Sequence, residues 1–234
     1  MPPVKPWVTF DFDRTLVKSP YWRLHFLPWL KNEAARQRLD PDALRRTFHE
    51  ASEQRWRQGR WVDSFDWGSI ARDLGLSPLP DIKPPVMTEL SPLMIAGAHD
   101  MLWALKRLNL RLGLVTNGFS TYQMPYVKAL GWEILFDRIA TPDGTGFAKP
   151  HPGIMTGFEP GLAHVGDRIW HDVLVAKRTQ RTAILIGDPK PESDRIDPLS
   201  SALLKPDYHV SDAHAVVPLI RFLLDRPGTA MPLK

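Results

Sequence analysis

Two aspartates at alternate positions close an apolar stretch near the start of the chain, in VTFDFDRTLV (residues 8–17). An ionised carboxylate beside a core is costly unless it is paired, hydrogen-bonded or bound to a metal. Asp11 and Asp13 therefore indicate either a solvated edge strand or a functional pair. Carboxylates at this spacing can supply a nucleophile, a proton donor or oxygen ligands for a hard cation.

Three further polar segments follow apolar runs along the chain. Thr116-Asn117-Gly118 follows LRLGLV, Lys149 lies downstream of LFDRIA, and GDRIWHD (residues 166–172) follows LAHV. Each has a simpler explanation by itself, as a turn or an exposed lysine. Asn-Gly favours a hairpin turn, but FSTYQMPYVKAL after it has the pattern of a helix rather than of a returning strand. The order and placement of the four segments carry the functional signal.

Short apolar runs alternating with helical patterns predict a parallel sheet that is covered on both faces. The expected strands span residues 7–10, 110–115, 135–140, 162–165, 183–186 and, more weakly, 208–210. The expected helices span about 97–108, 122–130, 172–179 and 212–224, the last with Ser211 as its N-cap. Ligands of open parallel sheets bind at the carboxyl ends of the strands, so the four polar segments are expected to converge.

Residues 18–90 contain no clear strand and predict a helical insertion. An amphipathic helix is expected over residues 40–59, with Asp40 or Asp42 near its start, and a second one in DWGSIARDLGL. Five tryptophans fall in this region: Trp22, Trp29, Trp56, Trp61 and Trp67. They are expected to form a small helical core, with the alternative that one or two stack on a base or sugar of a ligand.

Composition narrows the class of protein. The 234 residues suffice for one large domain or a core with a smaller one, and a net charge of +4 without a dense basic run argues against a nucleic-acid polymer as partner. The absence of cysteine excludes disulfides and thiolate chemistry, and no histidine pair has zinc spacing. Without a signal pattern or a membrane-length apolar run, a cytoplasmic protein away from membranes is expected.

In sequence order, Asp-x-Asp-x-Thr, a threonine ending an apolar strand, Lys-Pro and Gly-Asp-x-x-x-x-Asp resemble the four motifs of the haloacid dehalogenase-like (HAD) superfamily. The resemblance covers about residues 5–17 and 90–224. It implies an α/β fold with a three-layer Rossmann-like core around a parallel sheet, formed by residues 1–17 and 91–234. Residues 18–90 would be a helical cap domain inserted after the first strand. The implied activity is that of a phosphatase acting on a small phosphorylated metabolite.

The resemblance also assigns roles to the acidic residues. Asp11 takes the place of the nucleophile that forms an aspartyl-phosphate, and Asp13 that of the general acid and base. Mg²⁺ would be held by Asp11, the backbone carbonyl of Asp13 and Asp167, with Asp172 as a supporting or alternate ligand. Repulsion between two close carboxylates itself favours a hard cation with oxygen ligands.

Phosphate contacts follow from the same pattern. The Thr116 hydroxyl and neighbouring backbone N–H groups, including that of Gly118, would hold phosphoryl oxygens, and Lys149 would neutralise the nucleophile and the transferring group. Asn117 either contacts the substrate or shapes the turn. Arg14 stands where many members carry glycine, and it either restricts the turn or presents a cation to the mouth of the cleft.

Two further departures from the pattern affect fold and function. His171 takes a place often held by asparagine, and the interval from Lys149 to Asp167 is short for a full helix, so one covering helix is expected to be reduced or missing. Two alternative functions follow. A dehalogenase of the same fold would lack an acid/base aspartate at position 13, which argues against it. A non-catalytic binding or regulatory protein is favoured by the departures and disfavoured by the complete motif residues.

Overall fold

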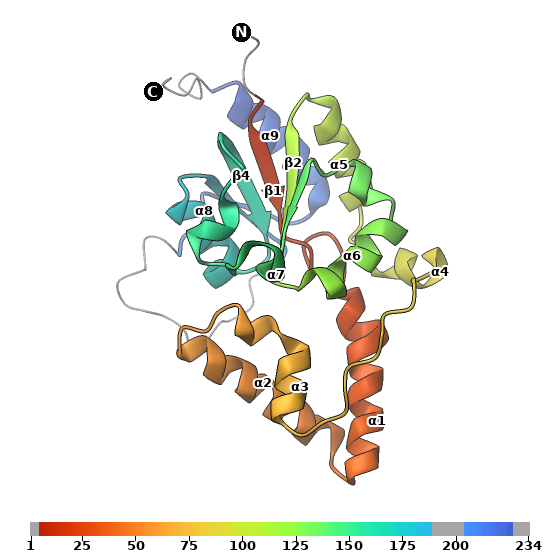
Figure 1. The fold of residues 1–234 in the computed structure, drawn as a ribbon. Helices are drawn as coiled ribbons and strands as arrows, with labels where there is room; N and C mark the ends of the chain where they lie inside the picture. The colour runs from red at the N-terminus through yellow and green to blue at the C-terminus, as the bar shows by residue number, and fades with distance from the viewer. Residues whose placement is uncertain (1–4, 189–203, 227–234) are drawn as a thin grey trace.

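The computed structural model describes residues 5–188 and 204–226, which form a six-stranded sheet with helices on both faces and a helical insertion (Figure 1). The strands are β1 (Trp7–Phe10), β2 (Arg111–Val115), β3 (Arg138–Ala140), β4 (Gly161–Gly166), β5 (Thr182–Ile186) and β6 (Tyr208–Val210). Their order is β3-β2-β1-β4-β5-β6, and every neighbouring pair is parallel. The predicted α/β class with a parallel sheet is confirmed.

The central strand β1 places the first polar segment at the middle of the sheet. Its four residues are buried because strands pack against it on both sides and helices cover both faces. Strand order reverses between β1 and β4, which makes the gap between their carboxyl ends a topological switch point. Asp11 follows β1 and Asp167 follows β4, so both carboxylates lie at this gap.

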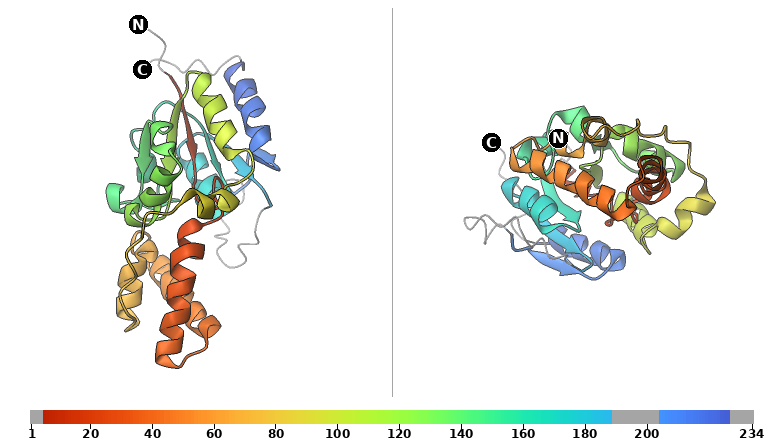
Figure 2. Two further views of the ribbon diagram at one scale, coloured as in Figure 1. Left: turned by 90° about the vertical axis from the view of Figure 1, so that its right-hand side faces the viewer. Right: turned by 90° about the horizontal axis from the view of Figure 1, so that it is seen from below.

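The helical layer on one face of the sheet is thicker than the layer on the other face. On one face lie α5 (Ala98–Arg107), α6 (Ser120–Ala129) and α9 (Val216–Leu224), and their apolar side chains share one large core with β1 and β2. On the other face lie a 3₁₀ turn, Pro152–Met155, and the short α8 (Leu174–Arg178). Figure 2 shows α5 and α9 on the same side of the sheet. The predicted reduction of one covering helix, between Lys149 and Asp167, is confirmed.

Phe158 compensates for the missing helix on the thin face. Its ring packs against Gly113 of β2 so closely that a Cβ added there would lie 2.4 Å from the ring. The same ring meets Trp7 edge-on, with ring centroids 5.0 Å apart. A bulky ring over a glycine thus covers the sheet where the chain is too short for a helix.

Two helix starts differ from the sequence prediction. The helix expected at residues 172–179 begins earlier, as a π-helical turn over Ile169–Val173 that leads into α8. The helix expected at 212–224 begins as a 3₁₀ turn, Ala213–Ala215, before α9. Its N-cap is Asp212 and not Ser211, because the Asp212 carboxylate accepts the backbone N–H groups of His214 and Ala215.

The insertion lies below the carboxyl ends of the strands (Figures 1 and 2). It consists of a π-helical turn, Trp22–Phe26, then α1 (Leu27–Gln37), α2 (Pro41–Arg57), a 3₁₀ turn, Asp63–Phe65, and α3 (Trp67–Asp73). An extended return leads to α4 (Met87–Leu90) and a 3₁₀ turn, Ser91–Leu93, before the sheet resumes. Both predicted helices, α2 and α3, are present; α1 was not predicted. Asp40 caps α2 by accepting the Ala43 N–H at 2.8 Å.

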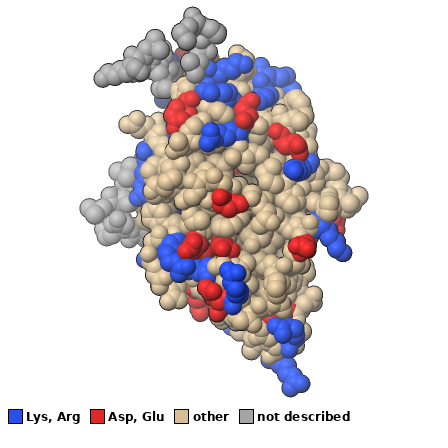
Figure 3. All heavy atoms as spheres, in the orientation of Figure 1, with Lys and Arg blue, Asp and Glu red and all other residues tan. Residues whose placement is uncertain are grey.

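Among residues 5–188 and 204–226, no helix combines the length and the hydropathy that a bilayer span requires. On the face drawn in Figure 3, acidic and basic side chains lie interspersed rather than in separate fields.

Candidate active site

The buried Lys149 bonds both Asp11, after the first strand, and Asp172, in the fourth polar segment. Lys149 Nζ donates to Oδ1 of Asp11 and to Oδ1 of Asp172, each at 2.6 Å. Burial alone would lower the pKa of Lys149, but the two carboxylates hold it above its usual value. The lysine is therefore a fixed positive charge beside Asp11.

Asp172 has no oxygen free of protein contacts. Besides Lys149, its Oδ1 meets His164 Nε2 at 3.2 Å, and its Oδ2 accepts the backbone N–H of Arg168 at 2.9 Å. Burial opposes ionisation, but Lys149 and His164 hold the pKa of Asp172 well below its usual range. This placement favours the supporting role considered for Asp172 over that of a direct metal ligand.

His164 and Thr9 complete this network from inside the sheet, and neither was predicted as a site residue. Thr9 Oγ1 lies 2.9 Å from His164 Nδ1, on the neighbouring strand. Burial lowers the pKa of His164, which favours the neutral ring. A neutral imidazole satisfies both contacts if Thr9 donates to Nδ1 and Nε2–H donates to Asp172. A single histidine in an apolar strand carries no motif, so only the fold reveals it.

Three acidic residues of the site lie close together. Asp11, Asp167 and Asp172 are buried, and each offers an oxygen within 4.8 Å of the others. Burial raises the pKa of Asp11 to about 8 despite Lys149, and burial together with Asp172 raises the pKa of Asp167 to about 6. Oδ2 of Asp167 is buried without a hydrogen-bond donor in the described part of the chain. Oxygens of Asp11 and Asp167, with the carboxylate of Asp172 beside them, suit a hard divalent cation.

Arg14 lies at the edge of this cluster. Its Nε is 3.2 Å from Asp167 Oδ2, an ion pair that lacks hydrogen-bond geometry. Its backbone has φ of 68°, in the left-handed region that favours glycine. Arg14 therefore strains the turn, and its guanidinium also lies beside the carboxylate of Asp167.

Asp13 occupies a separate position in the same cavity. Its Oδ2 accepts a hydrogen bond from Gln123 Nε2 at 2.7 Å, and burial raises its pKa. Gln123 belongs to α6 and was not predicted. Gly118 makes room for it, because a Cβ at Gly118 would lie 1.9 Å from Gln123 Nε2. The backbone N–H of Gly118 in turn donates to Thr116 Oγ1 at 3.1 Å.

Asn117 holds the segment that carries the lysine. Its Oδ1 accepts the backbone N–H of Lys149 at 2.7 Å, and its Nδ2 donates to the Lys149 carbonyl at 3.1 Å. His171 Nδ1 lies 3.2 Å from the same carbonyl. Burial lowers the pKa of His171 to about 3, so the ring is neutral. Asn117 therefore joins the second and third segments, a role that neither sequence alternative included.

Residues 6–179 match the family model of haloacid dehalogenase-like hydrolases. The chain belongs to this family. A crystal structure of a HAD phosphatase from Thermococcus onnurineus is similar to it, with 25% identity, a TM-score of 0.65 and coverage of 92% of this chain and 97% of that one. The L-2-haloacid dehalogenase from Xanthobacter autotrophicus shares the fold at 18% identity, with a TM-score of 0.58 over 94% and 99% of the two chains.

Curated relatives cover less of the chain. A glyceraldehyde 3-phosphate phosphatase from Methanothermobacter thermautotrophicus (strain Delta H) is 32% identical over 101 residues, 39% of this chain and 43% of that protein. One from Methanocaldococcus jannaschii is 27% identical over 132 residues, 52% of this chain and 54% of that protein. The chain thus spans about half or less of the length of these relatives.

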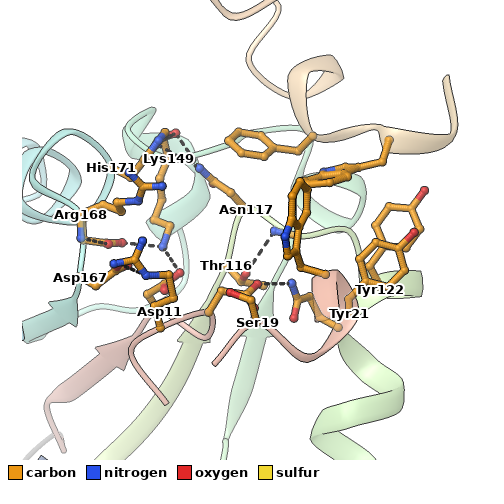
Figure 4. A pocket seen from close by; sticks show the side chains of 18 of the residues that line it. Asp11, Ser19, Tyr21, Thr116, Asn117, Tyr122, Lys149, Asp167, Arg168 and His171 are labelled. Carbon is orange, nitrogen blue, oxygen red and sulfur yellow. Dashed lines mark hydrogen bonds and ion pairs between the residues drawn. The ribbon is translucent and has the colours of Figure 1, made fainter. Parts of the chain in front are cut away.

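In this HAD-like hydrolase the predicted residues line one cavity of about 710 Å³ (Figure 4). Asp11, Asp167 and Lys149 lie on one side, and Tyr21 and Tyr122 lie on the other. The cavity brings together all the sequence-predicted site residues: Asp11, Asp13, Arg14, Thr116, Asn117, Gly118, Lys149, Asp167 and Asp172.

The helical insertion closes the cavity from the opposite side. Trp56 meets His171 edge-on with ring centroids 4.9 Å apart, and Phe65 lies 6.0 Å from the same ring. Trp29 is buried in the core of the insertion, as expected for the tryptophans. Trp22 and Trp67 pack against the same core, Trp56 is buried, and all three also line the cavity.

Proposed function

We propose that this chain is a Mg²⁺-dependent phosphatase that hydrolyses a small phosphomonoester through an aspartyl-phosphate on Asp11. The observation that carries the proposal is the pairing of two different carboxylates in one cavity. Asp11 accepts a hydrogen bond from the buried Lys149 ammonium, whereas Asp13 accepts one from the neutral amide of Gln123, and burial raises the pKa of both carboxyls. A carboxylate beside a fixed cation suits nucleophilic attack, and a carboxyl beside a neutral amide suits proton transfer.

Asp11, the backbone carbonyl of Asp13 and Asp167 would hold the cation. Bound there, Mg²⁺ would supply charge neutralisation for the nucleophile and the phosphoryl oxygens. The buried Oδ2 of Asp167, which has no hydrogen-bond donor in the described part of the chain, supports this choice of ligand. The HAD-like family assignment supports it as well.

In the first half of the reaction, a carboxylate oxygen of Asp11 forms a bond to phosphorus while the bond from phosphorus to the ester oxygen breaks. Asp13 gives its proton to the departing alkoxide, so the product leaves as an alcohol. Lys149 remains protonated and offsets negative charge on Asp11 and on the phosphoryl group. The Thr116 hydroxyl and the N–H groups that follow it would bind phosphoryl oxygens.

In the second half, Asp13 is ionised and accepts a proton from water. The water oxygen forms a bond to phosphorus, and the bond from phosphorus to Asp11 breaks, which releases inorganic phosphate, leaves Asp11 as a carboxylate and returns Asp13 to its protonated form. Gln123 donates to Asp13 and keeps it directed into the cavity. Residues 18–90 would act as the cap that covers this chemistry, over a core of residues 1–17 and 91–234.

Two alternatives make different predictions. A dehalogenase needs no proton donor at position 13, and fold similarity to a dehalogenase at 18% identity does not favour that activity. A non-catalytic protein would keep metal binding without turnover. The relatives named as phosphatases favour phosphate ester hydrolysis, and their name suggests triose phosphate as one substrate to test.

The experiment is phosphate release from a panel of phosphorylated metabolites, with Mg²⁺ and with EDTA. Asp11→Asn is expected to abolish release, whereas Asp100→Asn, at an exposed position on α5, is the matched control and should keep it. Activity of Asp11→Asn equal to that of the control would contradict the nucleophile assignment. Magnesium binding without release from any phosphate would favour the non-catalytic alternative.

A further inference from the structure

The cavity is larger and more aromatic than phosphoryl transfer requires. Its volume of about 710 Å³ lies within the range of about 300–1,000 Å³ typical of sites for drug-sized ligands. Away from the carboxylates its wall contains six aromatic side chains: Tyr21, Trp22, Trp56, Phe65, Trp67 and Tyr122. We call these six the aromatic wall. A three-carbon phosphate would leave most of it uncovered.

Four rings of the aromatic wall contact one another, and Trp56 and Phe65 form a second pair with ring centroids 5.9 Å apart. Tyr21 stacks on Tyr122, with centroids 4.5 Å apart and planes 26° apart. Trp67 meets Tyr21 at 6.3 Å and Trp22 at 5.0 Å, edge-on in both pairs. Tyr122 comes from α6 and the others from the insertion, and its hydroxyl accepts the Gly68 N–H at 3.1 Å. The wall is therefore a preformed surface between the insertion and the core.

We propose that the substrate is a phosphomonoester whose alcohol part carries a planar aromatic or heteroaromatic ring, which stacks on the aromatic wall. This inference rests on the proposed phosphatase function. Aromatic rings prefer stacked or edge-on contact with other rings, and one such contact changes affinity by about two- to tenfold. With the phosphoryl group at Asp11, the ring extends toward Tyr21 and Tyr122, on the other side of the cavity (Figure 4).

The first test measures binding without turnover. Benzylphosphonate and propylphosphonate, which cannot be hydrolysed, are titrated calorimetrically with Mg²⁺ into the full chain. Benzylphosphonate should bind the wild type about tenfold more tightly than propylphosphonate does. Trp22→Leu should reduce this ratio to about two or less. Trp103→Leu, the same change at an exposed tryptophan outside the cavity, should preserve it.

Tyr122→Leu provides a second variant should Trp22→Leu fail to fold, because Tyr122 is only partly buried and its ring stacks on Tyr21. Its ratio should also fall below that of Trp103→Leu. Equal affinities of the two phosphonates in the wild type, or an unchanged ratio in both cavity variants, would overturn the inference.

The second test compares esters of similar leaving alcohols. Benzyl phosphate, nucleoside monophosphates phosphorylated on the primary hydroxyl and glyceraldehyde 3-phosphate are compared by kcat/KM. The ring-bearing esters should exceed glyceraldehyde 3-phosphate at least tenfold, and the better of the two identifies a carbocyclic or a nucleobase ring. A preference for hydrolysing glyceraldehyde 3-phosphate would overturn the inference of an aromatic substrate but leave the proposed phosphatase function intact. Preferential binding of benzylphosphonate without hydrolysis of any ester would support the ring site but overturn the proposed phosphatase function.

Discussion

Lys149 Nζ lies 2.6 Å from Asp172 Oδ1, and this contact ties the segment after β3 to the π-helical turn after β4. Both side chains are 2% exposed. The same ammonium bonds Asp11 at the end of β1. A single buried charge thus fixes three loops at the carboxyl edge of the sheet, so the contacts that stabilise this edge are the ones that the proposed catalysis would use.

Asp172→Asn should destabilise the fold strongly. The change leaves Lys149 with Asp11 as its one carboxylate partner among residues 5–188 and 204–226, and breaking a buried ion pair costs about 3–5 kcal/mol. Asp42→Asn removes an exposed carboxylate that pairs with Arg45 at 3.0 Å, and it should cost less than about 1 kcal/mol. Urea unfolding of both variants measures the difference. Equal losses would contradict the structural role of Asp172.

The sequence predicted where this network lies but not which residues in it bond to one another. Short apolar runs located all six strands, because a buried parallel strand is almost entirely apolar and β1 is buried at every residue. The carboxyl-edge rule then placed Asp11, Thr116, Lys149 and Asp167 together. His164 was missed because its partner, Thr9, is 155 residues away and only strand pairing makes them neighbours.

The local sequence of α1 explains why this helix was not predicted. α1 follows a π-helical turn and carries Pro28 in its first turn, and four of its eleven residues are buried, including the acidic Glu33. Its pattern therefore lacks a clean apolar stripe, whereas α2 has Asp40 as cap and an amphipathic repeat. Gln123 was missed because a glutamine in a first helical turn has no catalytic signature.

Arg14→Gly should increase affinity for Mg²⁺. The guanidinium is 3.2 Å from Asp167 Oδ2, and a cation at that distance competes with a bound metal ion. Because two unit charges 4 Å apart interact by about 1 kcal/mol even in water, a gain of about fivefold or more is expected. Glycine tolerates the φ of 68° without strain. Calorimetric titration of Mg²⁺ measures the change directly.

Arg38→Gly is the matched control for this prediction. Arg38 also has a left-handed backbone, with φ of 57°, but it lies at the exposed end of α1, outside the cavity. Its Mg²⁺ affinity should stay within about twofold of the wild type. An equal gain in both variants would assign the effect to the backbone and not to the charge beside Asp167.

Gly118→Ala should lower kcat through Asp13. The new Cβ would lie 1.9 Å from Gln123 Nε2 and displace the amide that directs Asp13. Gln123→Leu removes the same hydrogen bond without the clash. Since general acid–base catalysis contributes about 10²–10⁴-fold, both variants should lose at least tenfold in kcat. Steady-state phosphate release is the measurement.

Gly131→Ala separates this effect from general backbone strain. Gly131 has φ of 66° and open space where a Cβ would stand, so alanine is strained there but touches nothing. It should lower stability and leave kcat near that of the wild type. Wild-type kcat in Gly118→Ala, or an equal loss in Gly131→Ala, would contradict the role assigned to Gln123.

Glu33→Gln should destabilise the insertion in a pH-dependent way. Glu33 is 3% exposed and accepts hydrogen bonds from the Ser77 hydroxyl at 2.6 Å and the Ser77 N–H at 3.1 Å, which join α1 to the return segment. Hydrogen bonds from Arg36, and then those from Ser77, hold the pKa of Glu33 well below its usual range. Charged hydrogen bonds contribute about 1.5–3 kcal/mol each, so a loss of about 2 kcal/mol is expected at pH 7.

The sign of the pH dependence follows from the lowered pKa. The stabilisation by Glu33 is complete above the unfolded pKa of about 4.3 and is lost as pH falls toward the folded value. The difference in free energy of unfolding between wild type and Glu33→Gln should therefore shrink between pH 5 and pH 3. Urea unfolding at several pH values measures it, and a difference that is constant or grows toward low pH would refute the assignment.

The central claim is that Asp11 carries the phosphoryl group during turnover. The most direct measurement is rapid quenching in acid during hydrolysis of a preferred substrate, followed by mass spectrometry of the peptides. The account predicts a phosphoryl adduct on Asp11 that builds up within the first turnover and is absent from Asp11→Asn. An adduct on another residue, or steady hydrolysis with no adduct at any quench time, would contradict it.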